Sequence, residues 1–249
     1  MNTNLIINDC INFFKNQKND IFIFSFITSC ISVFFYHFSI SNYDFEKMIE
    51  ILHAAKNINS LLLWINELPK EEKNFLLKIS LLSLISIFIN MILLFSLIIN
   101  YLFTLHKNKK IFIFSIFIKS LYQLPKMIIL FIICIILIYL GLILFIIPGI
   151  FFTIILSFSP IILLEKKNII PINAIIQSFK ISLNNWKNIF PIITIWFLIQ
   201  LLINLILIKL NLFPHIIHNL ISSIINNLLH SFLLIYYFRI YTLKNINYI

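Results

Sequence analysis

Glycine is almost absent from this 249-residue chain, which contains only Gly141 and Gly149. Two glycines cannot build a GxGxxG or Walker-type loop, in which backbone groups hold a phosphate, so the sequence excludes those nucleotide-binding motifs. The same scarcity excludes helix packing through GxxxG. We therefore expect the helices to pack through Ser, Ala and shape-matched Ile, Leu and Phe side chains.

Charged residues are also scarce, at 11% of the chain, whereas 61% of the residues are hydrophobic. A soluble domain is typically about half apolar and about a quarter charged. A lipid bilayer is the solvent that accommodates the apolar excess. The net charge of +10 does not indicate nucleic-acid binding, because the lysines lie between apolar runs rather than in one stripe.

Uncharged stretches that can cross about 30 Å of hydrocarbon recur along the chain. One of them, 127–164, is about twice as long as one span, and Pro148 and Gly149 lie just past its middle, so we predict a helical hairpin. The sequence thus predicts an all-α, polytopic membrane protein with six transmembrane helices in a single domain, 1–249. The predicted spans are about 21–40, 79–105, 127–147, 150–164, 189–210 and 220–242.

The largest segment between predicted spans is 42–78. We expect short helices at 45–56 and 58–67, and we expect Pro69 at the start of the next helix. The first span is expected to stay as a signal anchor, because its apolar run is too long for a cleaved signal peptide and no A-x-A-like site follows it.

Basic residues predict the orientation, because cytoplasmic loops carry an excess of lysine and arginine. Sorting the segments alternately places thirteen basic and three acidic residues on the side that holds both termini. The other side holds six basic and six acidic residues. We therefore predict that both termini are cytoplasmic.

Three segments that precede spans combine an apolar face with a polar, partly basic face at helical spacing; they lie in 7–15, 111–126 and 171–187. Such helices lie in the membrane interface, with basic residues toward anionic headgroups. We predict interfacial helices there and interpret the chain as three units, each an interfacial helix, an outgoing span and a returning span. A chain with so biased a composition can also produce such segments without a repeat.

Four strings in the second half carry a family resemblance: LPKMIILFI (124–132), IIPGIFFTIILSFSPIILLE (146–165), IQSFKISLNNWKNIFPIITIWFL (176–198) and LLIYYFRIYTL (233–243). They contain a Pro-Gly turn, a Ser-x-x-x-Ser-x-x-x-Trp segment and a terminal Tyr-x-x-Arg, in that order. With these features the chain resembles the YciC family of uncharacterised bacterial inner-membrane proteins. The resemblance implies a multi-pass protein of the inner membrane and supplies no activity.

No pattern in the sequence indicates a catalytic, cofactor-binding or metal site. There is no HExxH motif, and His215 and His218 have the spacing of two ligands without a third nearby. Cys10, Cys30 and Cys134 form no CxxC and are expected to be small buried hydrophobes. We therefore expect a non-enzymatic protein without a cofactor.

Uncharged polar side chains do occur inside the predicted spans. They are Asn90, Gln200, Asn204, Asn226, Asn227 and His230. We favour interhelical hydrogen bonding or mutational drift for them, in a protein that organises lipid or other membrane proteins. The alternative is a small transporter or channel lined by these residues. All nine acidic residues lie outside the apolar runs, which disfavours a proton- or sodium-coupled carrier.

Arg239 is the single arginine of the chain. Its guanidinium can bind a phosphate or a carboxylate through two parallel hydrogen bonds, as lysine cannot. We hypothesise that it holds a lipid phosphate or a helix C-terminus, next to an interfacial belt formed by Tyr236, Tyr237 and Tyr241. The alternative is that Arg239 supplies only a charge that sets the topology. The expected partners are the bilayer, anionic lipid headgroups and other membrane proteins.

Overall fold

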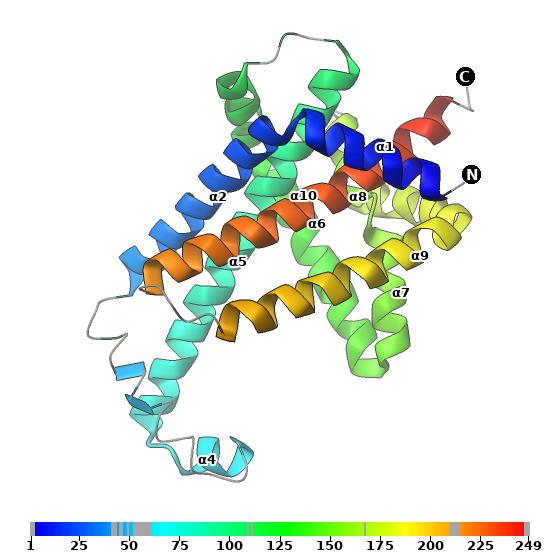
Figure 1. Cartoon of the computed structure of the whole chain (residues 1–249). Helices are drawn as coiled ribbons and strands as arrows, with labels where there is room; N and C mark the ends of the chain where they lie inside the picture. Colours follow the sequence, from blue (N-terminus) through cyan, green and yellow to red (C-terminus); the bar gives the residue numbers. More distant parts are fainter. Residues whose placement is uncertain are drawn as a thin grey trace.

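A computed structural model describes residues 3–40, 44, 47–48, 50–51, 61–108, 110, 112–166, 168–209 and 215–246. The regular elements within these residues are helices (Figure 1). They are α1 (Thr3–Asn16), α2 (Lys18–Ser39), α4 (Leu61–Glu67), α5 (Lys70–His106), α6 (Ile113–Leu144), α7 (Ile146–Leu156), α8 (Ser159–Glu165), α9 (Pro171–Lys209) and α10 (His215–Ile246).

Six helical segments are long and apolar enough to cross a membrane, which confirms the predicted number of spans. These segments are α2, α5, α6, the consecutive helices α7 and α8, α9 and α10. As predicted, the helix of the second span follows Pro69 directly. Of the helices expected between the first two spans, 58–67 corresponds in part to α4, and 45–56 lies largely outside the described residues.

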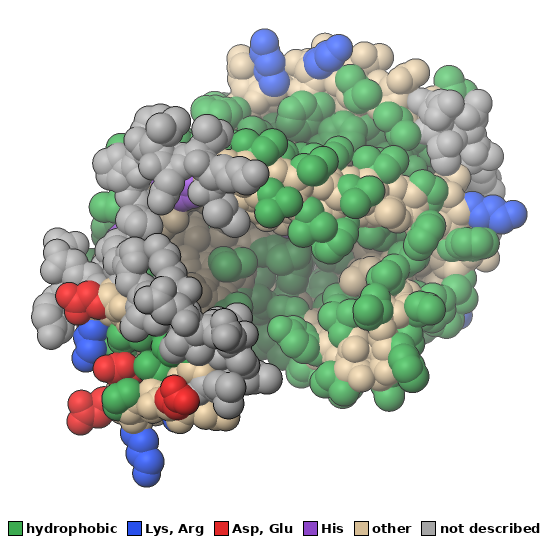
Figure 2. Space-filling view, turned by 60° about the horizontal axis from the view of Figure 1, so that its bottom comes forward, with side chains coloured by type: hydrophobic (Ala, Val, Ile, Leu, Met, Phe, Trp, Pro, Cys, Tyr) green, Lys and Arg blue, Asp and Glu red, His purple; other side chains and the backbone are tan. Residues whose placement is uncertain are grey.

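The two ends of the helix bundle differ in charge. The end that we call the basic end holds α1, the turn between α5 and α6, and the last turns of α10 (Figure 1). The opposite end, which we call the acidic end although acidic and basic residues balance on that side, holds α4 and the first turn of α5, with Glu67, Glu71 and Glu72 (Figures 1 and 2). The charge asymmetry expected from the sequence is therefore an asymmetry of the folded bundle.

The expected interfacial segments take two different forms. The first is a separate helix, α1, which ends before Gln17. We expected the other two to be separate helices as well. Instead, they form the first turns of α6 and α9. Pro125 and Pro191 lie inside these long helices. A proline removes one backbone donor, and the helix continues on both sides of it here.

The hairpin between the third and fourth spans turns earlier than predicted. Its non-helical residue is Phe145, in an extended conformation, and Pro148 and Gly149 already belong to the first turns of α7. The two glycines face each other across the hairpin, since a Cβ atom on Gly141 would lie 3.0 Å from the Cα of Gly149. The only glycines of the chain thus permit the close approach of α6 and α7.

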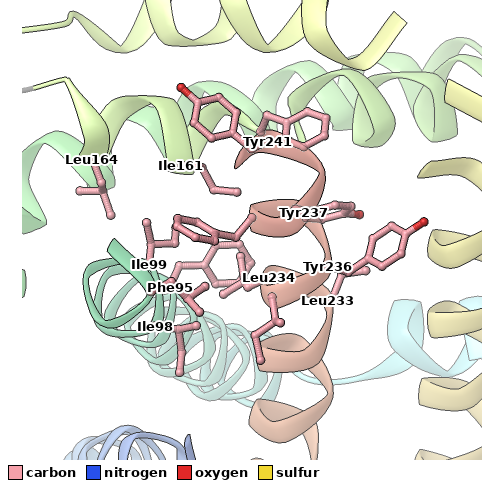
Figure 3. Close-up of a cluster of buried hydrophobic side chains, with 14 of the residues drawn as sticks. Phe95, Ile98, Ile99, Ile161, Leu164, Leu233, Leu234, Tyr236, Tyr237 and Tyr241 are labelled. Carbon is pink, nitrogen blue, oxygen red and sulfur yellow. The ribbon is translucent and has the colours of Figure 1, made fainter. Parts of the chain in front are cut away.

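Buried side chains concentrate toward the basic end. There, α5, α8 and α10 pack together through a cluster of aromatic and aliphatic side chains (Figure 3). Every residue of α5 from Ile92 to Phe103 is buried. By contrast, no residue of α9 from Ile193 to Leu207 is buried. The bundle is therefore tightly packed near the basic end and more open toward the acidic end.

A row of small polar residues allows α2 to approach its neighbours. Ser25, Thr28, Ser29 and Ser32 are all buried on one side of α2. Ser32 and Ser86 lie with their hydroxyl oxygens 2.8 Å apart, and Ser86 also donates to the carbonyl of Ser32 at 2.8 Å. The expected packing through Ser in place of Gly is confirmed at this contact.

Candidate functional site

A polar cavity of about 500 Å³ lies between α2, α5, α9 and α10, in the half of the bundle nearer the acidic end. Figure 2, in which the lower end of Figure 1 comes forward, shows a hollow in the middle of this face. Val33, Ile87, Met91 and Leu94 supply apolar walls. The polar lining consists of Ser32, Tyr36, Ser83, Ser86, Asn90, Gln200, Asn204, Asn219, Ser222, Ser223, Asn226, Asn227 and His230.

All six intramembrane polar residues singled out in the sequence line this one cavity. They come from three different spans, so their proximity could not be inferred from spacing. The hydroxyl groups and Asn219 were missed. A signal for them exists along α10, where Asn219, Ser222, Asn226 and His230 recur every three or four residues and therefore share one helix face.

At the deep end of the cavity, Asn90 and Asn227 form a reciprocal amide pair. Each side-chain nitrogen donates to the other residue's side-chain oxygen at 3.0 Å. Asn227 also donates to Ser29 at 2.8 Å and lies 3.0 Å from the hydroxyl of Thr28. This cluster joins α2, α5 and α10, so these two asparagines act as the interhelical hydrogen-bonding residues that the sequence analysis favoured.

Other lining groups have unused hydrogen-bonding capacity. The amide nitrogen of Asn226 donates to Asn204 at 3.4 Å, whereas its side-chain oxygen is buried without a hydrogen-bond partner among the described residues. His230 Nδ1 lies 2.7 Å from the carbonyl oxygen of Asn226 and must donate to it. The proton is therefore on Nδ1, and Nε2 of the neutral ring is an acceptor. Trp196 packs edge-on against this ring at 5.0 Å.

The described lining is electrically neutral, because it contains no Asp, Glu, Lys or Arg. A charged ligand would leave water without a counter-charge, which is costly in a low-dielectric site. Amides and hydroxyls both donate and accept hydrogen bonds. The cavity is therefore suited to an uncharged group that carries hydroxyls or amides.

The cavity ends at Leu94 of α5 and His230 of α10. Beyond it lies a seal, formed by the buried residues 95–101 of α5 and Leu233 and Leu234 of α10 (Figure 3). Seven helical residues cover about 10 Å. A second cavity, of about 390 Å³, opens beyond the seal at the basic end and shares no lining residue with the first. In the described part of the chain, these two cavities are therefore separate.

Arg239 lines the second cavity, and its partner is Asp9 of α1. Arg239 Nη2 and Asp9 Oδ2 are 3.1 Å apart, and the two side chains are 50% and 53% exposed. This is a single contact with a carboxylate, and the hypothesis that the guanidinium also holds a lipid phosphate or a helix C-terminus through two bonds stays a prediction. Cys10 is buried beside this pair, and burial raises the pKa of its thiol to about 12.

The tyrosines near Arg239 do not form the expected interfacial belt. Tyr236, Tyr237 and Tyr241 are 1%, 5% and 4% exposed and belong to the core (Figure 3). The hydroxyl of Tyr236 donates to the backbone of Asn188 at 2.9 Å, and that of Tyr241 donates to Glu165. Tyr236 and Tyr241 therefore attach α10 to neighbouring helices through their hydroxyls, and Tyr237 does so by packing edge-on against Phe158.

The serines of the Ser-x-x-x-Ser-x-x-x-Trp segment serve the broken fourth span. Ser178 and Ser182 of α9 donate to the backbone oxygen of Ile155 at 2.5 Å and 3.1 Å. Ser178 also accepts a hydrogen bond from the backbone nitrogen of Phe158 at 3.2 Å. Side chains of α9 thus satisfy backbone groups at the break between α7 and α8, as a bilayer requires. Sequence analysis recognised the segment but not this role.

Among the described residues, no group of three or more His, Cys, Asp or Glu side chains is placed to hold a metal ion. His218 is partly buried near the start of α10. The side chain of His215 lies outside the described residues, so the predicted absence of a metal at this pair stays a prediction.

Comparison with known proteins connects this architecture to a family. The profile of an uncharacterised protein family, UPF0259, matches residues 1–243. The chain belongs to the UPF0259 family. This membership confirms the resemblance to the YciC family and extends it to the first half of the chain. Together with the six apolar helices, it identifies a protein embedded in a lipid bilayer.

Several curated relatives are similar over nearly their whole length. A UPF0259 membrane protein of Wigglesworthia glossinidia brevipalpis is 35% identical over 98% of this chain and 95% of its own length. Relatives from Photorhabdus laumondii and Serratia proteamaculans are 26% and 27% identical over 96% of this chain, and over 94% and 97% of their own lengths. No solved structure matches the chain.

The amide pair predicts non-additive mutational effects. We expect Asn90→Leu and Asn227→Leu each to lower stability in lipid, with Asn227→Leu lowering it more because Asn227 also contacts α2. Interhelical hydrogen bonds in membranes contribute about 1 kcal/mol, so the double variant should be more stable than the sum of the single effects predicts, by about that amount. Thermal unfolding in nanodiscs measures this coupling, and additive effects would show that the pair is not coupled.

The contact between Arg239 and Asp9 predicts a small effect, because half-exposed ion pairs contribute about 0–1 kcal/mol. Arg239→Lys and Asp9→Asn should each change the unfolding temperature in nanodiscs slightly and to a similar extent. Lysine can keep a single contact to the carboxylate. A large loss in Arg239→Lys together with no loss in Asp9→Asn would mean that the guanidinium has another, more important ligand.

Proposed function

We propose that this is a non-enzymatic protein of the bacterial inner membrane, with both termini in the cytoplasm. In this proposal, the cavity near the acidic end faces the outer side of the membrane and binds an uncharged ligand rich in hydroxyl or amide groups. The single observation that carries the proposal is the uncharged described lining at membrane depth, in which 13 of 17 residues carry a hydroxyl, amide or imidazole group.

The orientation is supported by the charge of the two ends. The side that includes α1, the α5–α6 turn and the end of α10 has a net excess of ten basic residues, whereas the opposite side has none. Excess lysine and arginine mark cytoplasmic segments. We expect the lysines near the basic end, such as Lys15 and Lys18, to contact anionic headgroups of the inner leaflet.

Ligand binding is supported by the size and chemistry of the cavity. Its volume of about 500 Å³ is typical of small-molecule sites, which occupy about 300–1,000 Å³. The side-chain oxygen of Asn226 is buried without a partner among the described residues. This oxygen has almost no exposed surface, so a ligand can donate a hydrogen bond to it once the Asn226 side chain rotates toward the cavity, and that bond would remove the cost of an unsatisfied buried polar group.

The arrangement favours binding over an open channel or catalysis. The seal separates the cavity from the basic end, so a solute in the cavity has no continuous polar path across the described spans. Among its described residues, the lining has no carboxylate or lysine that could work with His230 in acid–base chemistry. The transporter alternative would require the seal to open.

A substitution that fills the cavity tests this proposal. Ser222 lines the cavity and forms no described side-chain hydrogen bond, so Ser222→Phe should occupy the site without removing an interhelical contact. Ser80→Phe is the matched control, because Ser80 is exposed on α5 outside the cavity lining. We expect mass spectrometry to detect a molecule that copurifies with the parent protein and with Ser80→Phe but is lost from Ser222→Phe. Identical copurifying molecules in all three proteins would contradict the proposal.

A further inference from the structure

We propose that the ligand of the polar cavity between α2, α5, α9 and α10 is a neutral glycerolipid. It enters sideways from the outer leaflet between α5 and α9. This inference rests on the proposed function, and it adds the class of ligand and the route of entry. The hydroxyl-bearing head of the lipid occupies the polar lining, and its acyl chains lie along the apolar surfaces of α5 and α9.

The first observation is that α9 is exposed on both sides of its polar stripe. Gln200 and Asn204 line the cavity and lie one turn apart on the same face. Leu201 and Leu205, on one flank of this stripe, are exposed, and so is Ile199 on the other flank. In a closed bundle, neighbouring helices cover both flanks of an inward-facing stripe. Here the polar cavity and the lipid-facing surface of α9 adjoin each other directly.

The second observation concerns α5, which forms the wall of the cavity opposite α9. Among the described residues, α5 and α9 share no extensive packing contact, although both line the cavity. Ile87 belongs to the lining of the cavity and is nevertheless 61% exposed. Leu84, one turn toward the acidic end, is also exposed. The described edges of the gap are therefore apolar, and hydrocarbon chains can lie along them without desolvating polar groups.

The third observation is the neutrality of the site. A phosphate that entered the cavity would find no lysine or arginine among the described lining residues. Phosphates in proteins are normally held by such cations or by free backbone N–H groups. Free hydroxyls of glycerol or of a sugar instead match the donors and acceptors of Asn219, Asn226 and His230. These contacts select a neutral glycerolipid over a phospholipid.

The test uses the delipidated full-length protein and native mass spectrometry. The probes are dioleoylglycerol, phosphatidylglycerol with the same acyl chains, and free glycerol. We expect one dioleoylglycerol to bind to the parent protein, and to bind at least tenfold more weakly to Ser222→Phe. Phosphatidylglycerol should bind the parent and the variant equally. Asn219→Leu, which removes no described hydrogen bond, should also weaken dioleoylglycerol binding, whereas the control Asn184→Leu, on the exposed surface of α9, should not.

The outcomes separate the two proposals. If glycerol or another soluble molecule binds in a manner sensitive to Ser222→Phe and dioleoylglycerol does not, the cavity binds a ligand but the lipid inference is wrong. If phosphatidylglycerol shows the same sensitivity as dioleoylglycerol, selection for a neutral head is wrong. If no probe distinguishes the parent from either cavity variant and no copurifying molecule does so, both proposals are wrong.

Photocrosslinking tests the route of entry. A diacylglycerol with a photoreactive group in its acyl chain should crosslink to peptides that contain 81–87 of α5 or 198–205 of α9. Filling the head site with Ser222→Phe should reduce this crosslinking at least tenfold, and Ser80→Phe should not. Crosslinks spread evenly over all spans would contradict entry between α5 and α9.

Discussion

The amide pair of Asn90 and Asn227 is the contact on which the arrangement of the spans depends. In hydrocarbon the hydrophobic effect does not drive apolar helices together, so close packing and hydrogen bonds must hold them. The pair and its contacts to Thr28 and Ser29 join three spans at one depth. Toward the basic end the helices pack closely, and toward the acidic end they diverge around the cavity.

The boundary between the closely packed half and the open half of the bundle explains why polar amide residues have two roles. The side chains of Asn90 and Asn227 form hydrogen bonds with each other and thereby hold the helices together. Asn219 lies about two turns farther along α10 toward the acidic end and lines the open part of the cavity. From the sequence, interhelical hydrogen bonding and the lining of a transporter or channel are alternatives for these polar residues. In the fold, the interhelical pair forms the floor of the polar cavity, so the two roles are adjacent parts of one structure.

The spans were predictable because bilayer thickness sets the length of an apolar run. Local geometry within them was less predictable. The position of the hairpin turn at Phe145 depends on the contact between Gly141 and Gly149 across the hairpin. Tyr236 and Tyr241 of α10 are core residues because hydrogen-bond partners from other helices reach them. The partner of Arg239 is 230 positions away in the sequence, so spacing could not reveal it.

The candidate site was visible in the sequence as separate polar residues but not as a site. Intramembrane Asn, Gln and His are unusual enough to be noticed one by one. Their convergence depends on the way three spans cross, and no local pattern encodes that crossing. The recurrence of polar residues along α10 was the part of the site that sequence periodicity could have found.

We propose a cavity that is open to the outer side of the membrane and ends at a buried seal, and thiol accessibility along α5 distinguishes the two regions. With the native cysteines replaced, Ser83→Cys places a thiol in the cavity and Ser96→Cys places one in the seal. We expect a membrane-impermeant reagent added from the outer side to label Ser83→Cys at once and to label Ser96→Cys only after denaturation. Labelling of Ser83→Cys from the cytoplasmic side alone, or equal labelling of both thiols, would contradict it.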